Sequence, residues 1–152
     1  ENFLTSPGKA IRFEETGNAR TYLILDEATG DLLAYFSVSF KELILEGTGL
    51  SKTKIRSLDG ISKNAERIRS FLIGQLGKNM AINGNPIGLA DILNEAYAVF
   101  AAAKQLIGGR VIILECENIP ELIAYYERHG FALIETVTGD SDLRTLYIHI
   151  VE

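Results

Sequence analysis

Two adjacent tyrosines close a short helical segment late in the chain, and the inner one could move a proton. In the segment NIPELIAYYERHGFALI, residues 118–134, apolar residues at helical spacing turn Tyr126 inward and place Tyr125 to one side. A buried phenol needs a hydrogen-bond partner or an opening, because an unpaired hydroxyl costs about 1–3 kcal/mol. Tyr126 is therefore either an ordinary core tyrosine or a proton donor that faces a cleft.

Two carboxylates precede this segment. Glu115 and Glu117 end the apolar run VIILECE, where they form either a solvated strand end or acid–base groups beside a cleft. Cys116 between them is best interpreted as a small buried residue. His129 and His149 are far apart in sequence and lack the spacing of metal ligands, so we predict no metal site.

A glycine-rich stretch, MAINGNPIG, leads into the longest helical pattern of the chain. Backbone N–H groups at a helix N-terminus bind anions such as phosphates, and those of Gly84, Ile87, Gly88 and Leu89 are candidates. Pro86 removes one such donor. Taken alone, the glycines could also do no more than turn the chain into the helix.

The composition fits one globular domain. The 152 residues are 47% hydrophobic and carry a net charge of −5, which gives no general indication of a nucleic-acid or membrane surface. No apolar run is long enough to cross a bilayer. The single cysteine excludes an intramolecular disulfide and favours a reducing compartment, so we expect a cytoplasmic protein.

The order of elements that must position these residues is three strands, a helix, a strand, a helix and two strands. Asn118, with Glu121 three residues later, is predicted to cap the second helix, and Gly130 to end it. Residues 41–66 lose periodicity and are predicted to form a long exposed excursion with one helical turn at most. The predicted strands are 22–25, 32–40, 66–79, 110–117, 131–137 and 143–151, and the predicted helices are 87–107 and 118–129.

This order resembles that of the GNAT family, the Gcn5-related N-acetyltransferases. The segments that carry the resemblance are RTYLILDEATGDLLAYFSVS, LIGQLGKNMAINGNPIG, NIPELIAYYERHGF and LRTLYIHI, of which YERHGF is the most specific. The resemblance implies an α/β (α+β) fold: a mixed, mostly antiparallel sheet with a central parallel βαβ unit and helices on both faces. It also implies one GNAT-like domain over residues 1–152, with the family's first strand upstream of residue 1.

The resemblance further implies acetyl transfer from acetyl-CoA to a primary amine, without a metal. The family's pyrophosphate loop falls on residues 83–88, but Asn83 stands where the family has Gln or Arg, and Pro86 where it has its first glycine. The pantetheine arm would run beside the strand that ends at Leu76, and the N–H near Lys78 would bind the thioester carbonyl.

The resemblance also places roles on residues of the second helix and the strand before it. Asn118 would bind the pantetheine or phosphate arm, and Tyr126 would protonate the departing thiolate, since its ordinary pKa of about 10 is close to the 8.5 of a thiol. Glu115 is our candidate for the base that deprotonates the amine, directly or through water.

Three functional hypotheses stay open. The first is an acetyltransferase whose acceptor is a small-molecule or peptide amine. The second follows a likeness to the toxin branch of the family, which acetylates aminoacyl-tRNA; a basic cluster comprising Lys52, Lys54, Arg56, Lys63, Arg67 and Arg69 could contact RNA, although the net charge opposes it. The third is a non-catalytic acyl-CoA-binding or interaction module. A homodimer is compatible with each of them.

Overall fold

A computed structural model of the chain describes residues 2–5, 7–134 and 143–150. Within these residues, six strands form a sheet in the order β1-β2-β3-β4-β6-β5, with β3 and β4 as its parallel pair. The predicted mixed, mostly antiparallel sheet is confirmed. The strands are β1 (Arg20–Leu25), β2 (Leu32–Ile44), β3 (Arg67–Lys78), β4 (Val111–Glu117), β5 (Ala132–Ile134) and β6 (Leu143–His149).

The chain divides into two compact units. The first unit comprises Glu1–Ser39 and Ile73–Ala102, and the second comprises Phe40–Leu72 and Ala103–Glu152. Strands β2 and β3 each contribute one part to each unit, as does helix α4 (Leu89–Ile107). Helices α3 (Lys52–Asp59) and α5 (Pro120–Glu127) belong to the second unit.

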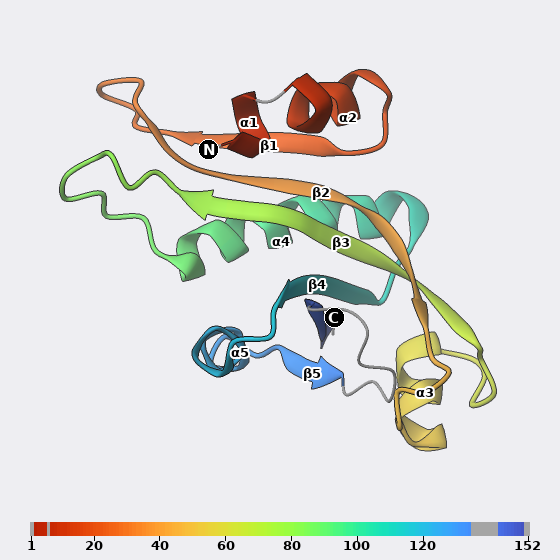
Figure 1. The fold of residues 1–152 in the computed structure, drawn as a ribbon. Coiled ribbons are helices and arrows are strands. Elements are labelled where there is room, and N and C mark those ends of the chain that lie inside the picture. Colours follow the sequence, from red (N-terminus) through yellow and green to blue (C-terminus); the bar gives the residue numbers. More distant parts are fainter. Residues whose placement is uncertain (1, 6, 135–142, 151–152) are drawn as a thin grey trace. The chain divides into compact units, whose positions relative to one another are not determined.

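The first unit contains the β1–β2 hairpin, in which Tyr22 pairs with Phe36 in antiparallel register (Figure 1). The turn that joins these two strands is organised by Asp26. The Asp26 carboxylate accepts hydrogen bonds from the N–H groups of Ala28 and Thr29, and Gly30 adopts a φ of 76°. Asp26 thus organises the turn locally, as an Asx turn does.

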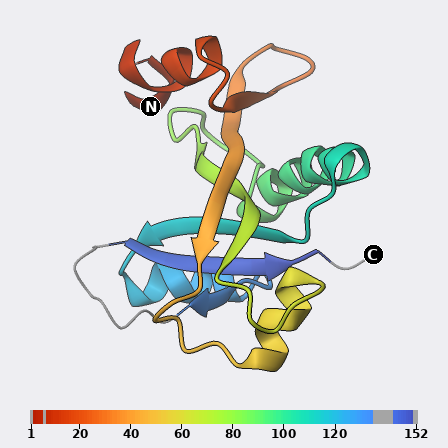
Figure 2. The same cartoon turned by 90° about the vertical axis from the view of Figure 1, so that its right-hand side faces the viewer.

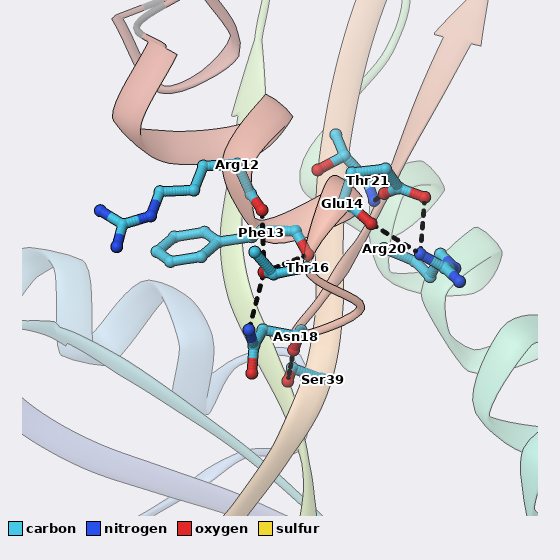
Figure 3. Close-up of polar contacts among 8 residues, drawn as sticks. All are labelled: Arg12, Phe13, Glu14, Thr16, Asn18, Arg20, Thr21 and Ser39. Atoms are coloured by element: carbon cyan, nitrogen blue, oxygen red, sulfur yellow. Dashed lines mark hydrogen bonds and ion pairs between the residues drawn. The ribbon is translucent and has the colours of Figure 1, made fainter.

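Short helical turns precede this hairpin: α1 (Asn2–Thr5), the π-helical η1 (Pro7–Ile11) and α2 (Arg12–Glu15). Figure 3 shows how polar contacts hold α2 against β1. The Glu14 carboxylate accepts from Arg20 Nη1 at 3.0 Å and from the Thr21 N–H at 2.9 Å. The Ser39 hydroxyl donates to the Asn18 carbonyl, so the end of the helical turns is tied to β2 as well.

The glycines of β3 mark close approaches to side chains of β2. A Cβ at Gly74 would lie 2.9 Å from Ser37 Oγ, and one at Gly77 would lie 2.8 Å from the Tyr35 ring. Ser37 of β2 is polar but only 2% exposed. Its hydroxyl is satisfied there by the Gln75 N–H at 2.9 Å, and the missing side chain of Gly74 makes the room.

The second unit is built on β6, which lies between β4 and β5 and runs antiparallel to both (Figure 2). Val111 and Ile113 of β4 and Tyr147 of β6 pack in a buried cluster with Ile55 and Leu58 of α3. Predicted strand 131–137 corresponds to β5, and its residues 135–137 lie outside the described residues.

The prediction for residues 41–66 is wrong in two respects. Strand β2 continues to Ile44, and residues 52–59 form helix α3, capped by the Ser51 hydroxyl and ended by Gly60 with a φ of 92°. The sequence shows no clear helical spacing of apolar residues here, because only Ile55 and Leu58 of this short helix are buried. Helix α4 begins at Leu89 and not at residue 87.

Among residues 2–5, 7–134 and 143–150, no helix combines the length and the apolar character that crossing a membrane requires.

Candidate functional site

The loop before α4 lies in the first unit and is held by a buried asparagine. The side-chain amide of Asn85, 9% exposed, donates to the Leu33 carbonyl at 2.9 Å and to the Asn79 carbonyl at 3.2 Å. Its Oδ1 accepts from the Ile87 N–H at 3.1 Å. Asn85 was not among the predicted site residues, because loop asparagines are common and nothing in the sequence shows that this one is buried.

Helix α4 begins with a reciprocal cap. The Gly88 carbonyl accepts the first helical bond, from the Ile92 N–H, and the Asp91 carboxylate accepts from the Gly88 N–H at 2.8 Å. An acidic residue three positions after the cap is a recognised signal for this arrangement, and Asp91 supplies it.

These bonds correct the list of predicted phosphate donors. The N–H groups of Ile87 and Gly88 are already bonded within the chain, to Asn85 and Asp91. The N–H groups of Gly84 and Leu89 make no hydrogen bond to any residue that the structure describes. Gly84, with a φ of 67°, is exposed, as is the neighbouring Asn83. A diphosphate on this loop would therefore contact Gly84, Leu89 and the next N–H of the first helical turn, beside the Asp91 carboxylate.

The position of Asp91 leads to a prediction with a definite sign. Asp91→Asn should raise the affinity for CoA several-fold, because it removes a negative charge near the bound phosphates. The same change should cost at most about 1 kcal/mol of stability, since it weakens the cap. Calorimetry with CoA and thermal unfolding measure the two effects. Glu95→Gln on the exposed side of α4 is the matched control, and equal effects of both changes would place the phosphates elsewhere.

The end of β3 supplies the remaining predicted donor-side residues of the first unit. Leu76 is half-buried and Lys78 is exposed, and the chain then turns at Asn79, whose N–H and side-chain amide donate to the Leu33 and Leu32 carbonyls at 2.8 Å each. This fixes the point at which the strand ends and the loop starts. The binding roles of Leu76 and Lys78 stay predictions.

Helix α5 of the second unit carries the tyrosines. The predicted capping role of Asn118 is wrong: the N-cap is Ile119, and it makes no side-chain capping bond. Pro120 starts the helix with φ already set for it, and the exposed Asn118 amide is left outside. The predicted end is confirmed, with Gly130 at a φ of 95°.

Tyr126 lies on the inner side of α5, as predicted. It is half-buried, whereas Tyr125 is 39% exposed, and its ring packs edge-on against Phe131 with centroids 6.1 Å apart. Within the described residues its hydroxyl has no hydrogen-bond partner. Burial raises the pKa of the Tyr126 phenol, and nearby Cys116 and Tyr125 add to the rise. The phenol thus keeps its proton at neutral pH and is available as a donor.

Glu115 is placed less favourably for its predicted role. Its carboxylate forms an ion pair with the Lys41 ammonium, reaching from β4 to the part of β2 in the same unit. The ammonium already occupies a carboxylate oxygen that would have to accept the proton of the substrate amine. Glu115 is therefore a weaker candidate for the base than the sequence indicates. Glu117 at the end of the strand is exposed and makes no ion pair with a described residue.

Cys116 and His129 make contacts typical of residues that stabilise the fold. Cys116 is 7% exposed, and burial raises the pKa of its thiol, although Arg144 opposite it on β6 acts in the other direction. His129 contacts the Tyr125 carbonyl through Nδ1 at 2.8 Å. In the described part of the chain, no group of three or more His, Cys, Asp or Glu residues could hold a metal ion.

The predicted site residues thus fall into two groups. Leu76, Lys78, Asn83, Gly84, Ile87, Gly88 and Leu89 belong to the first unit, and Glu115, Asn118 and Tyr126 belong to the second. Within the second unit, Cys116 lies close enough to Tyr126 to contribute to the raised pKa of the Tyr126 phenol.

No model of a known protein family matches the chain, and no curated protein sequence matches it. Solved structures do match. AtaT complexed with acetyl-methionyl-tRNAfMet has a TM-score of 0.73 at 18% identity, covering 97% of this chain and 79% of that one. A tyrosine-to-phenylalanine mutant of KacT has a TM-score of 0.70 at 22% identity, with coverages of 97% and 79%. AtaTR bound with AcCoA has a TM-score of 0.65 at 21% identity, with coverages of 97% and 78%.

These matched proteins are GNAT-fold toxin acetyltransferases, and the chain has their fold. The resemblance noted in the sequence is therefore confirmed at the level of the fold.

Proposed function

We propose that the chain is an acetyl-CoA-dependent N-acetyltransferase of the GNAT type. Tyr126 carries the proposal, because a half-buried phenol without a hydrogen-bond partner among the described residues stands where the family resemblance puts the proton donor. The shared fold and the open N–H groups of Gly84 and Leu89 support it.

The acceptor amine attacks the thioester carbonyl, and the resulting oxyanion collapses with loss of the CoA thiolate, which takes a proton. In this chain, the first turn of α4 would hold the diphosphate and the N–H near Lys78 would stabilise the oxyanion. Tyr126 would donate the proton. Because the raised pKa of Tyr126 keeps it protonated, it suits this step and not the deprotonation of the amine.

An alkylamine with a pKa of about 10.4 must lose a proton before it attacks. The Lys41 ion pair engages Glu115, so we assign this step to water, with Glu115 in contact with that water at most. Glu115→Gln should therefore lower turnover only a few-fold, whereas a direct base typically contributes about 10²-fold or more. Turnover measured against pH distinguishes Glu115 as the direct base from Glu115 as a contact of the water. Lys41→Met, which removes the ion-pair partner of Glu115, is the second variant to measure.

The proposal is tested by following release of the CoA thiol from acetyl-CoA with a panel of primary amines. Turnover above the rate of acetyl-CoA hydrolysis supports it. Tight CoA binding without transfer to any acceptor would instead support the third hypothesis, a non-catalytic acyl-CoA-binding module.

A second candidate acceptor is aminoacyl-tRNA, because the AtaT structure with acetyl-methionyl-tRNAfMet has this fold. The predicted basic cluster lies on α3, the start of β3 and, with Lys63, the turn between them, but several of its members are engaged. Lys52 contacts Asn64, Lys54 lies over the Tyr147 ring, and Arg67 pairs with Glu42. The cluster is therefore weaker than its sequence suggests.

The two acceptors differ in their response to salt. Transfer of a labelled acetyl group to aminoacyl-tRNA should fall steeply with added salt if Lys and Arg side chains contact phosphates, whereas transfer to a small amine should not. Arg56→Glu, an exposed residue of the cluster, should reduce transfer to tRNA about tenfold and leave transfer to small amines unchanged. An antitoxin partner, such as the AtaR segment bound to AtaT, would be expected only with the tRNA acceptor.

A further inference from the structure

We propose that a groove in the second unit binds a segment of a partner polypeptide that carries an acidic residue among apolar ones. The groove has a volume of about 950 Å³, and its walls come from β2, β3, the end of α3 with Ile61 after it, and the end of α4 with the loop that follows. None of the residues proposed above to bind CoA or to move a proton lines it, although Arg67 and Arg69 of the basic cluster do.

The groove has an apolar surface that folding leaves uncovered. Phe40 is 67% exposed, Ile61 is 86% exposed and Ile107 is 66% exposed, and all three line the groove. Phe40 also contacts the buried Phe71, with ring centroids 6.2 Å apart. Large apolar side chains gathered in one concave place indicate a binding surface more strongly than the same residues scattered singly.

Two glycines allow the chain to pack closely around the groove, because a larger side chain at either position would clash with a neighbour. Gly109 has a φ of 133°, and a Cβ there would lie 2.4 Å from the Phe71 ring. Gly60 has a φ of 92°, and a Cβ there would lie 2.9 Å from Arg110 Nε. Arg110 in turn donates to the Ser57 carbonyl at 3.1 Å. A groove already formed in this way spares a ligand part of the ordering cost of binding.

One charge in the groove is left without a partner. Lys41 pairs with Glu115, and Arg67 Nη1 pairs with Glu42 at 3.1 Å. Arg69, exposed on β3, makes no hydrogen bond or ion pair with any residue that the structure describes. Its guanidinium can bind a carboxylate through two parallel N–H groups, the geometry that arginine favours.

The combination fits an acidic and apolar peptide better than a nucleic acid. The carboxylates of Glu42 and Asp59 also line the groove, so it suits a ligand with one carboxylate among apolar side chains better than a chain of phosphates, in which every unit is negatively charged. The aliphatic side chains of Ile61 and Ile107 can pack against apolar peptide side chains, but they lack the aromatic rings on which nucleic-acid bases stack. Arginine and aromatic residues are also the types that most often dominate binding energy at protein interfaces.

The test is selection from a displayed library of random peptides on the full chain, followed by fluorescence anisotropy with the enriched peptides. We expect enriched sequences to combine Asp or Glu with Leu, Ile or Phe. Arg69→Glu should weaken their binding about tenfold or more, and Phe40→Ser should weaken it similarly. Lys63→Glu, an exposed change in the same unit but outside the groove, should leave it unchanged.

Several results would overturn the proposal. The first is a selection that enriches no peptide motif. The second is enriched peptides that bind the Arg69→Glu variant as tightly as the unchanged protein. The third is a loss of peptide binding in Lys63→Glu as large as the loss in Arg69→Glu. Tighter binding of single-stranded RNA than of any peptide, abolished by Arg69→Glu, would identify a nucleic-acid site instead. A concentration-dependent dimer that dissociates on Phe40→Ser would identify a second copy as the occupant. Retention of acetyl transfer by Phe40→Ser separates this surface from the proposed enzymatic site.

Discussion

Replacing Tyr126 by Phe should lower kcat by roughly 10²-fold or more and leave CoA affinity nearly unchanged. The ring and its edge-on contact with Phe131 are retained, and only the hydroxyl is lost. Since that hydroxyl has no partner among the described residues, its removal should also leave the melting temperature nearly unchanged. The paired measurement of kcat and melting temperature therefore distinguishes a proton donor from a packing residue.

Tyr125→Phe is the internal control, because its 39% exposed ring lies on the same helix one position earlier. It should change neither kcat nor stability. The pH profile adds a second readout: burial raises the pKa of Tyr126, so loss of the proton donor should reduce activity only above pH of about 10. An active Tyr126→Phe variant would show that water protonates the thiolate.

Replacing Gly88 by Glu should weaken CoA binding about ten- to a hundredfold, by placing a second carboxylate beside Asp91 at the first turn of α4. We expect the unchanged protein to bind CoA in the micromolar range typical of substrates. The structure indicates that the side chain can be accommodated, because a Cβ at Gly88 would meet only the Asp91 carboxylate, at 3.8 Å, and Gly88 does not need a positive φ. A loss of affinity would thus report on the ligand and not on folding.

Gly88→Gln separates charge from bulk. It adds a side chain of the same length without the negative charge, so it should retain most of the affinity that Gly88→Glu loses. Calorimetry with CoA at two salt concentrations checks this, since the charge effect should shrink as salt screens it. Unchanged CoA affinity in a folded Gly88→Glu protein would mean that the phosphates bind away from this helix.

The sequence by itself determined the features that depend on local spacing and turn chemistry. The strand ranges 22–25 and 32–40 predicted from the sequence match the first hairpin, and a glycine after the last helical residue indicated the end of α5 at Gly130. The inward position of Tyr126 followed from helical periodicity alone. These signals lie within a few residues of each other, so no knowledge of distant contacts is needed to interpret them.

Only the tertiary structure decided which polar groups are already engaged. The Lys41–Glu115 ion pair joins residues on β2 and β4, and the bonds of Asn85 reach a carbonyl of β2, so neither can be deduced from neighbouring residues. Helix α3 was missed although Ser51 and Gly60 mark its ends, because only Ile55 and Leu58 are buried, and their packing in the cluster around Tyr147 is a tertiary contact. Side chains distant in sequence compete for the same hydrogen bonds and charges, and only their positions in the folded chain determine which pairs form.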